Sequence, residues 1–144
     1  GCEVEEFDDA VRVVASKPLK NTQVTTLPYP GFPTDMQAQF MALMTVADGT
    51  SVVTETVFEN RFMHIPYLRE LGADITVKNQ TATIIGTTKL IGSSVVATDL
   101  RAGAAMVAAA LLAEGTTRIT NVEHILRGYE NMEEKLKNIG AKIY

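Results

Sequence analysis

Histidine, cysteine and tryptophan are scarce in this chain, which contains two, one and none of them among its 144 residues. The single thiol, Cys2, cannot form an internal disulfide, so a reducing compartment is expected and the predicted location is cytoplasmic. Cys2 also has no histidine near it in sequence, and we expect an ordinary thiol rather than a nucleophile. His64 and His124 lack the HxH and HExxH spacings of metal ligands, so no metal site is predicted.

Motifs for cofactors, membranes and nucleic acids are absent as well. Neither GxGxxG nor GxxxxGKS/T occurs, and no cofactor is expected. The longest apolar stretch, residues 102–113, is too short and too rich in alanine to span a bilayer. The net charge is −4 and the basic residues are scattered, which argues against binding to nucleic acid. We therefore expect no membrane and no nucleic-acid partner.

The chain contains two near-identical cassettes, Thr34-Asp35-Met36-Gln37-Ala38 and Thr98-Asp99-Leu100-Arg101-Ala102. Each precedes an apolar stretch, an acidic residue followed by Gly-Thr, a β-like run, an arginine-bearing loop and a Gly-Ala pair. Internal similarity at a fixed spacing indicates one supersecondary unit that is used twice. The two copies also place a carboxylate and an arginine at equivalent positions.

Strand-like and helix-like stretches alternate along the chain and predict an α/β fold. A complete β-α-β-α-β-β unit is expected over 23–86, and a second copy over 94–144, with a helix over 128–139 and a third strand from Lys142 onward. Residues 1–15 resemble the closing hairpin of a preceding unit. The chain is therefore interpreted as a single partial domain, an excerpt from a longer protein.

The two repeated aspartates are the first candidates for chemistry. Thr34 or Asp35, and Asp99 in the second copy, are suited to cap a helix, because a short oxygen-bearing side chain precedes each apolar stretch. The helix dipole would keep such a carboxylate ionised, which also suits a contact with a substrate. Spacing alone leaves both interpretations open.

Three arginines are the second candidates. Arg61 and Arg127 follow equivalent strands, and Arg101 lies at the start of the second long helix. Together they would be able to hold a carboxylate or phosphate through bidentate hydrogen bonds. The alternative for each arginine is a surface ion pair.

Four segments resemble the UDP-N-acetylglucosamine 1-carboxyvinyltransferase (MurA) family of enolpyruvyl transferases, in the same order and over essentially the whole chain. They are Phe32-Pro33-Thr34-Asp35-Met36-Gln37, the run from Thr54 to His64 that contains Phe58-Glu59-Asn60-Arg61-Phe62, Ala97-Thr98-Asp99-Leu100-Arg101-Ala102 and Arg127-Gly128-Tyr129-Glu130. The resemblance implies an inside-out α/β barrel in which each domain holds three of the units described above. The chain would supply about two of the three units of one domain.

The resemblance also implies an activity. The family transfers the enolpyruvyl group of phosphoenolpyruvate to the 3-hydroxyl of UDP-N-acetylglucosamine and releases phosphate, the first committed step of peptidoglycan synthesis. Asp35 corresponds to the carboxylate proposed to take the proton of that hydroxyl, and Thr34 adjoins it. Val57 corresponds to a backbone contact with the sugar nucleotide, and Phe58 lies beside it.

The charged positions carry over in the same way. Arg127 resembles the arginine that closes over phosphoenolpyruvate. Asp99 and Arg101 match a second charged cassette near the reacting centre, and Arg61 matches the arginine of the neighbouring loop. The family's cysteine-bearing loop belongs to its other domain and has no counterpart here, so the chain alone is expected to be inactive.

Three alternatives remain at the level of sequence. A 5-enolpyruvylshikimate-3-phosphate synthase shares the repeat and the donor, although the run Glu59-Asn60-Arg61-Phe62 argues against it. A non-catalytic oligomerisation module is a second interpretation, and a partial domain with uncovered apolar faces is expected to self-associate. A nucleic-acid binder of the RNA-cyclase type is disfavoured by the negative net charge.

Overall fold

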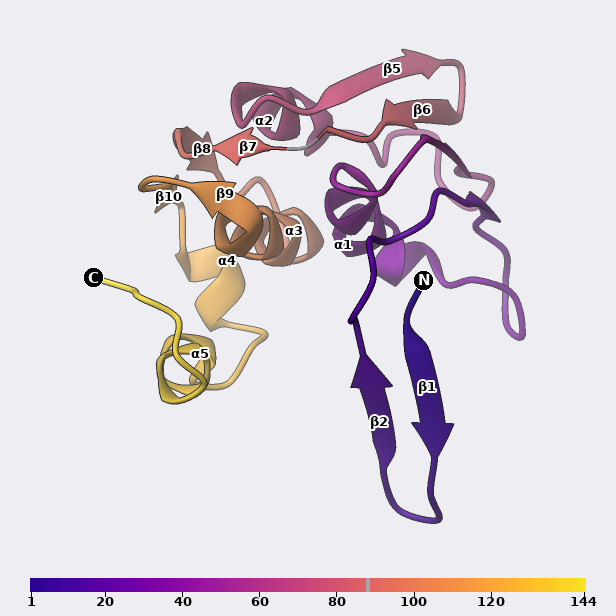
Figure 1. The fold of residues 1–144 in the computed structure, drawn as a ribbon. Helices are drawn as coiled ribbons and strands as arrows, with labels where there is room; N and C mark the ends of the chain where they lie inside the picture. Colours follow the sequence, from indigo (N-terminus) through magenta and orange to yellow (C-terminus); the bar gives the residue numbers. More distant parts are fainter. Residues whose placement is uncertain (88) are drawn as a thin grey trace.

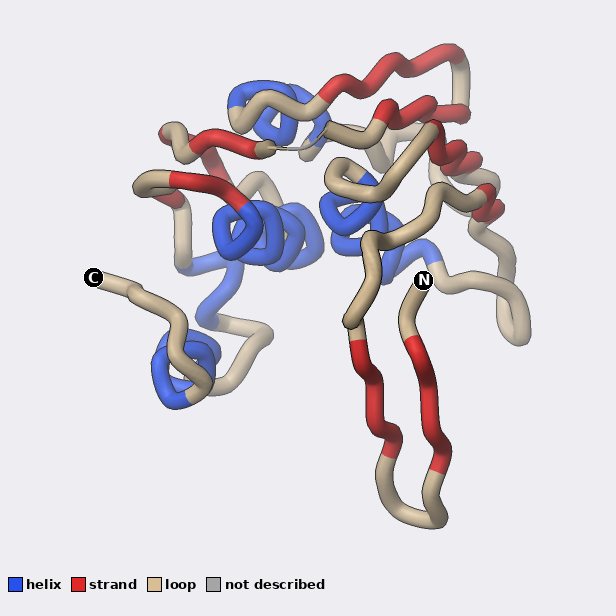
Figure 2. The backbone as a smooth tube through the Cα atoms, viewed as in Figure 1, coloured by secondary structure: helices blue, strands red, loops and turns tan. Residues whose placement is uncertain are grey.

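The computed structural model describes residues 1–87 and 89–144 and shows the expected mixture of helices and strands (Figures 1 and 2). Two long helices lie side by side in the middle, with strands above them in the view of Figure 1 and a hairpin reaching away from the body. Within the described residues, no helix has the length and apolar character needed to cross a membrane.

The first repeat unit follows the predicted order of elements. They are β3 (Gln23–Thr25), α1 (Gln37–Met44), β4 (Thr50–Thr54), α2 (Ile65–Glu70), β5 (Asp74–Lys78) and β6 (Thr81–Ile85). The strands form a four-stranded sheet in the order β3-β4-β6-β5, in which β3 and β4 run parallel and the other neighbours antiparallel. A short 3-10 helix, η1 (Thr34–Met36), precedes α1 and carries the first cassette.

The second unit is related but less regular. It contains β8 (Ser94–Val96), α3 (Leu100–Leu112), β10 (Arg118–Thr120), α4 (Glu123–Leu126) and α5 (Met132–Asn138). Strands β8 and β10 pair in parallel, as β3 and β4 do. Two further strands, β7 (Leu90–Ile91) and β9 (Ala113–Glu114), form a short parallel pair that the sequence pattern did not predict.

Two sequence predictions in this unit are wrong. The helix expected over 128–139 begins only at Met132, because Asn131 has a left-handed backbone (φ 49°) that a continuous helix excludes. The strand expected from Lys142 onward is not formed over the described residues 141–144. Its counterpart β5 pairs with β6, whereas residues 141–144 pair with no strand among the described residues.

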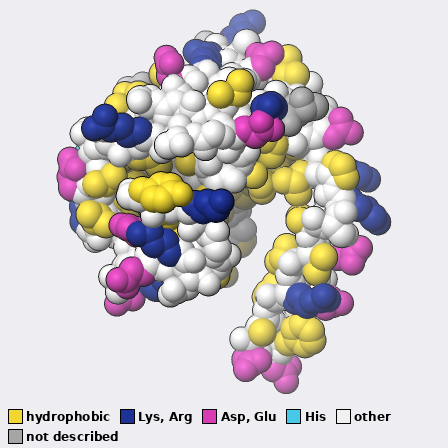
Figure 3. All heavy atoms as spheres, turned by 60° about the vertical axis from the view of Figure 1, so that its left-hand side comes forward, with side chains coloured by type: hydrophobic (Ala, Val, Ile, Leu, Met, Phe, Trp, Pro, Cys, Tyr) yellow, Lys and Arg dark blue, Asp and Glu magenta, His cyan; other side chains and the backbone are white. Residues whose placement is uncertain are grey.

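The N-terminal hairpin packs against little else. Strands β1 (Glu3–Glu6) and β2 (Val11–Val14) pair antiparallel, with Val4 opposite Val13. These two valines, and Phe7 at the turn, are each more than half exposed. Figure 3 shows the hairpin standing away from the body with hydrophobic side chains along it.

The core lies where the two long helices meet and against the sheet. Met41 of α1 and Met106 of α3 are fully buried, with Ala42 and Ala105 beside them. Small side chains let the helix axes approach closely, so the start of α1 comes next to the start of α3. In the first turns of α3, Ala102, Ala105 and Met106 are each at most 2% exposed, whereas Leu111 in its last turn is 53% exposed.

Candidate functional site

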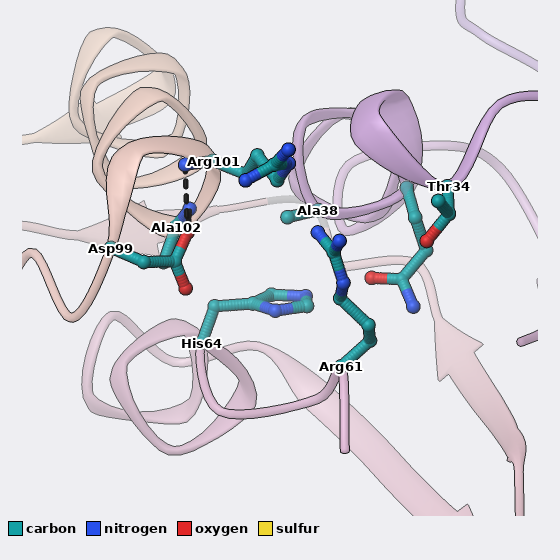
Figure 4. Close-up of a pocket in the computed structure, with 8 residues that line it drawn as sticks. Thr34, Ala38, Arg61, His64, Asp99, Arg101 and Ala102 are labelled. Carbon is teal, nitrogen blue, oxygen red and sulfur yellow. Dashed lines mark hydrogen bonds between the residues drawn. The ribbon is translucent and has the colours of Figure 1, made fainter. Parts of the chain in front are cut away.

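The candidate site lies where η1, the start of α3 and the loop after β4 converge. Figure 4 shows side chains from all three segments turned toward one another. They line a small cavity of about 10 Å³, roughly the size of one water molecule. Its lining includes Thr34, Arg61, His64, Asp99 and Arg101.

Asp35 binds two arginines from different parts of the chain. Its Oδ1 accepts a hydrogen bond from Nε of Arg101 at 2.5 Å and lies 3.7 Å from Nη1 of Arg61. The hydrogen bond from Arg101 lowers the pKa of Asp35, and the charge of Arg61 adds to this effect. The same bond raises the pKa of Arg101. The Asp35 side chain is 61% exposed, so a ligand has access to the pair.

The repeated aspartate of the second cassette does something different. Oδ1 of Asp99 accepts hydrogen bonds from the backbone N–H groups of Arg101 (2.7 Å) and Ala102 (3.0 Å), so Asp99 caps helix α3 as predicted. The prediction that Thr34 or Asp35 caps α1 is wrong. No side chain caps η1 or α1, because the Thr34 hydroxyl is bound by Glu55 and the Asp35 carboxylate by Arg101.

His64 forms the floor of the cavity. It is 2% exposed, and this burial lowers its pKa to about 4, so the ring is neutral at pH 7. Its Nε2 has no hydrogen-bond partner among the described residues. The structure therefore places His64 in the core.

The loop after β4 carries the remaining predicted contacts. The Phe58 ring lies under the guanidinium of Arg61, with Cζ 4.2 Å from the ring centre, in cation–π geometry. Val57 and Phe58 are 39% and 47% exposed. The backbone N–H groups of both residues are directed inward, where they bind Glu55.

Glu55 is the feature that the sequence analysis missed. It is 1% exposed, yet it is a carboxylate without an ion-pair partner among the described residues. Burial raises its pKa, but hydrogen bonds from the Val57 and Phe58 N–H groups and from the Thr26 and Thr34 hydroxyls outweigh burial and lower it below the ordinary value. The signal in the sequence was an acidic residue directly after the valine-containing strand β4.

Arg127 lies apart from this cluster. It follows α4, is exposed and does not line the cavity. The structure thus gathers Thr34, Asp35, Arg61, Asp99 and Arg101 at one place and connects Val57 and Phe58 to them. The predicted cluster of three arginines is reduced to Arg61 and Arg101.

Comparison with known proteins agrees with this architecture. The family model for EPSP synthase (3-phosphoshikimate 1-carboxyvinyltransferase) matches residues 1–136. The chain is 56% identical over 143 residues to UDP-N-acetylglucosamine 1-carboxyvinyltransferase from Thermodesulfovibrio yellowstonii, covering 99% of this chain and 34% of that protein. It is also 56% identical over 144 residues to UDP-N-acetylglucosamine 1-carboxyvinyltransferase 1 from Caldanaerobacter subterraneus, covering 100% of this chain and 35% of that protein.

Solved structures show the same fold. The enolpyruvyl transferase NikO from Streptomyces tendae matches with a TM-score of 0.90 at 32% identity, over 100% of this chain and 34% of that one. EPSP synthase from Acinetobacter baumannii matches with a TM-score of 0.68 at 18% identity, which supports the fold alone. The chain thus spans about a third of the length of the curated relatives that it matches. The match over residues 1–136 shows that the chain belongs to the EPSP synthase (3-phosphoshikimate 1-carboxyvinyltransferase) family.

Proposed function

We propose that this chain is part of an enzyme that transfers the enolpyruvyl group of phosphoenolpyruvate to the 3-hydroxyl of UDP-N-acetylglucosamine and releases phosphate. This proposal rests on the 56% sequence identity that the chain shares, over 99–100% of its length, with two relatives named UDP-N-acetylglucosamine 1-carboxyvinyltransferase. In this arrangement the chain forms one wall of the active site. Residues 1–15 would close a preceding unit, 23–86 form a complete unit, and 94–144 form a partial one.

Asp35 is proposed as the group that takes the proton of the sugar hydroxyl. The oxygen of that hydroxyl then forms a bond to C2 of phosphoenolpyruvate, while the electrons of the C=C double bond take up a proton at C3 from a general acid in the cleft. In the second step C3 loses a proton, the double bond forms again and the bond from C2 to the phosphate oxygen breaks, which releases phosphate. Bound to Arg101, Asp35 is a weak base, because the ion pair lowers its pKa. An anionic donor would compete with Asp35 for the guanidinium of Arg101. When Arg101 binds the donor instead of Asp35, the pKa of Asp35 rises and the carboxylate becomes a stronger base.

The other predicted residues take supporting roles in this proposal. Arg127 binds phosphoenolpyruvate, while Arg61 and Arg101 offset the donor's negative charge. Asp99 holds Arg101 in place by capping its helix. The segment of Val57 and Phe58 presents its exposed face to the sugar nucleotide. Thr34 lies directly before the base.

A 5-enolpyruvylshikimate-3-phosphate synthase is the disfavoured alternative. The chain is 18% identical to the solved EPSP synthase from Acinetobacter baumannii, but 56% identical to a relative named UDP-N-acetylglucosamine 1-carboxyvinyltransferase. Calorimetric titration of the complete gene product with UDP-N-acetylglucosamine and with shikimate 3-phosphate separates the two. Binding of shikimate phosphate alone would overturn the proposed acceptor.

We predict that the 144-residue chain by itself releases no phosphate from phosphoenolpyruvate and UDP-N-acetylglucosamine. The reason is that the cleft needs groups from the part of the relatives that this chain does not cover. A coupled phosphate assay with the purified chain, and with the complete gene product as the positive control, tests this. Phosphate release by the isolated chain would refute the prediction.

Replacing Asp35 by Asn in the complete gene product is predicted to reduce kcat by about 10²–10⁴-fold, the range typical of a lost general base. Asn keeps the shape of the side chain but cannot accept a proton, so the KM for the sugar nucleotide should change far less. Asp48→Asn is the matched control, because Asp48 is exposed and lies outside the site. A kcat within about tenfold of the wild type would rule out Asp35 as the base.

The isolated chain is predicted to self-associate. Hydrophobic side chains of the hairpin, such as Val4, Phe7 and Val13, are exposed, and the edges of β1 and β2 are unpaired over the described residues. Sedimentation velocity across a hundredfold range of concentration measures this. A single monomeric species throughout the range would contradict the prediction.

A further inference from the structure

Glu55 presents a problem that the proposed mechanism does not solve. A buried carboxylate is costly unless its charge is compensated, and here five hydrogen-bond donors and no cation provide the compensation among the described residues. An amide could not replace it directly, because one of its two polar atoms is a donor. The site therefore uses a group that accepts on both of its oxygens.

The first oxygen holds the loop after β4. Oε1 accepts from the backbone N–H of Val57 at 2.9 Å, from the N–H of Phe58 at 3.1 Å and from the Thr26 hydroxyl at 2.9 Å. The Thr26 hydroxyl in turn accepts from the N–H of Thr56 at 2.9 Å. Three consecutive backbone amides of one loop are thus fixed by the carboxylate, directly or through a single hydroxyl.

The second oxygen holds the turn that carries Asp35. Oε2 accepts from the Thr34 hydroxyl at 2.9 Å and from Nε2 of Gln37 at 3.0 Å. Thr34 is the first residue of η1 and Gln37 the first residue of α1, so the two contacts lie on either side of Asp35. Gln37 is itself 1% exposed, which leaves this arrangement little room to relax.

We infer that Glu55 is a positioning residue that locks the Asp35 turn and the Val57–Phe58 loop into one rigid unit. Hydrogen bonds to an ionised carboxylate are stronger than those between neutral groups, and here they join the turn of the proposed base to the proposed sugar-nucleotide contacts. The acceptor hydroxyl then meets Asp35 at a fixed distance from the segment that holds the rest of the substrate. This inference deepens the proposed function and rests on it for its kinetic consequence, but not for its structural one.

The structural consequence is tested by amide hydrogen exchange in the complete gene product. Glu55→Ala is expected to lower protection of the Val57 and Phe58 amides by about tenfold or more, because it removes the acceptor that both amides use. Glu55→Gln is expected to lower protection less, because its amide oxygen still accepts from the loop while its NH₂ group faces the donors Thr34 and Gln37. Glu59→Gln, in the same loop but exposed, is the matched control and should leave protection unchanged. Unchanged protection in both Glu55 variants would overturn the inference, whatever the enzyme's activity.

The kinetic consequence is tested with a rescue pair. Glu55→Gln is expected to raise the KM for UDP-N-acetylglucosamine and to lower kcat, so that kcat/KM for this substrate falls by about tenfold to a hundredfold. The KM for phosphoenolpyruvate should change by less than about threefold. Adding Gln37→Glu exchanges the two side chains, so the amide oxygen introduced at position 55 accepts from the loop while its NH₂ group donates to the carboxylate at position 37. The double variant should recover most of the loss.

The outcomes separate the inference from the proposed function. No enolpyruvyl transfer by the wild type would refute the proposed function and leave the exchange experiment to decide the role of Glu55. Glu55 would only stabilise the fold if kcat/KM fell equally for both substrates, the Tm of the variant fell and Gln37→Glu restored no activity. Wild-type kinetics in Glu55→Gln would also overturn the inference.

Discussion

The ion pair between Asp35 and Arg101 depends on the packing of α1 against α3. The two helices belong to repeat-related units, and alanines at their interface bring the helix starts together. Because of this packing, Arg101 reaches Asp35 although 66 residues separate them in sequence. A duplicated unit thus supplies a carboxylate from one copy and its cation from the other.

Three acidic residues in the site have three different electrostatic environments. Asp99 satisfies backbone donors at a helix start, Asp35 faces two guanidinium groups, and Glu55 is enclosed by neutral donors. Only Asp35 combines exposure with a pairing that a ligand can break. This distribution supports Asp35 as the group that exchanges a proton, while the other two hold backbone in place.

Much of this arrangement was accessible from the sequence, and the remainder had physical reasons to be hidden. The cassettes predicted the repeat and its helices, but not the ion pair between Asp35 and Arg101. Similarity between the cassettes also suggested a helix cap in each of them, yet tertiary partners decided that only Asp99 caps a helix. Glu55 escaped notice because the Thr26, Thr34 and Gln37 side chains that bind it lie 29, 21 and 18 positions away, and spacing along the chain records none of these contacts. The left-handed backbone at Asn131 was equally invisible to helix periodicity.

The central claim is that α1–α3 packing gives Asp35 an arginine partner that controls its basicity. The most direct test is the pKa of Asp35, measured by NMR titration of its side-chain carboxyl carbon in the wild type and in Arg101→Gln. The account predicts a wild-type pKa below the ordinary value of 3.8 and a rise toward that value when the guanidinium is removed. An ordinary pKa in the wild type, or no change on substitution, would contradict it.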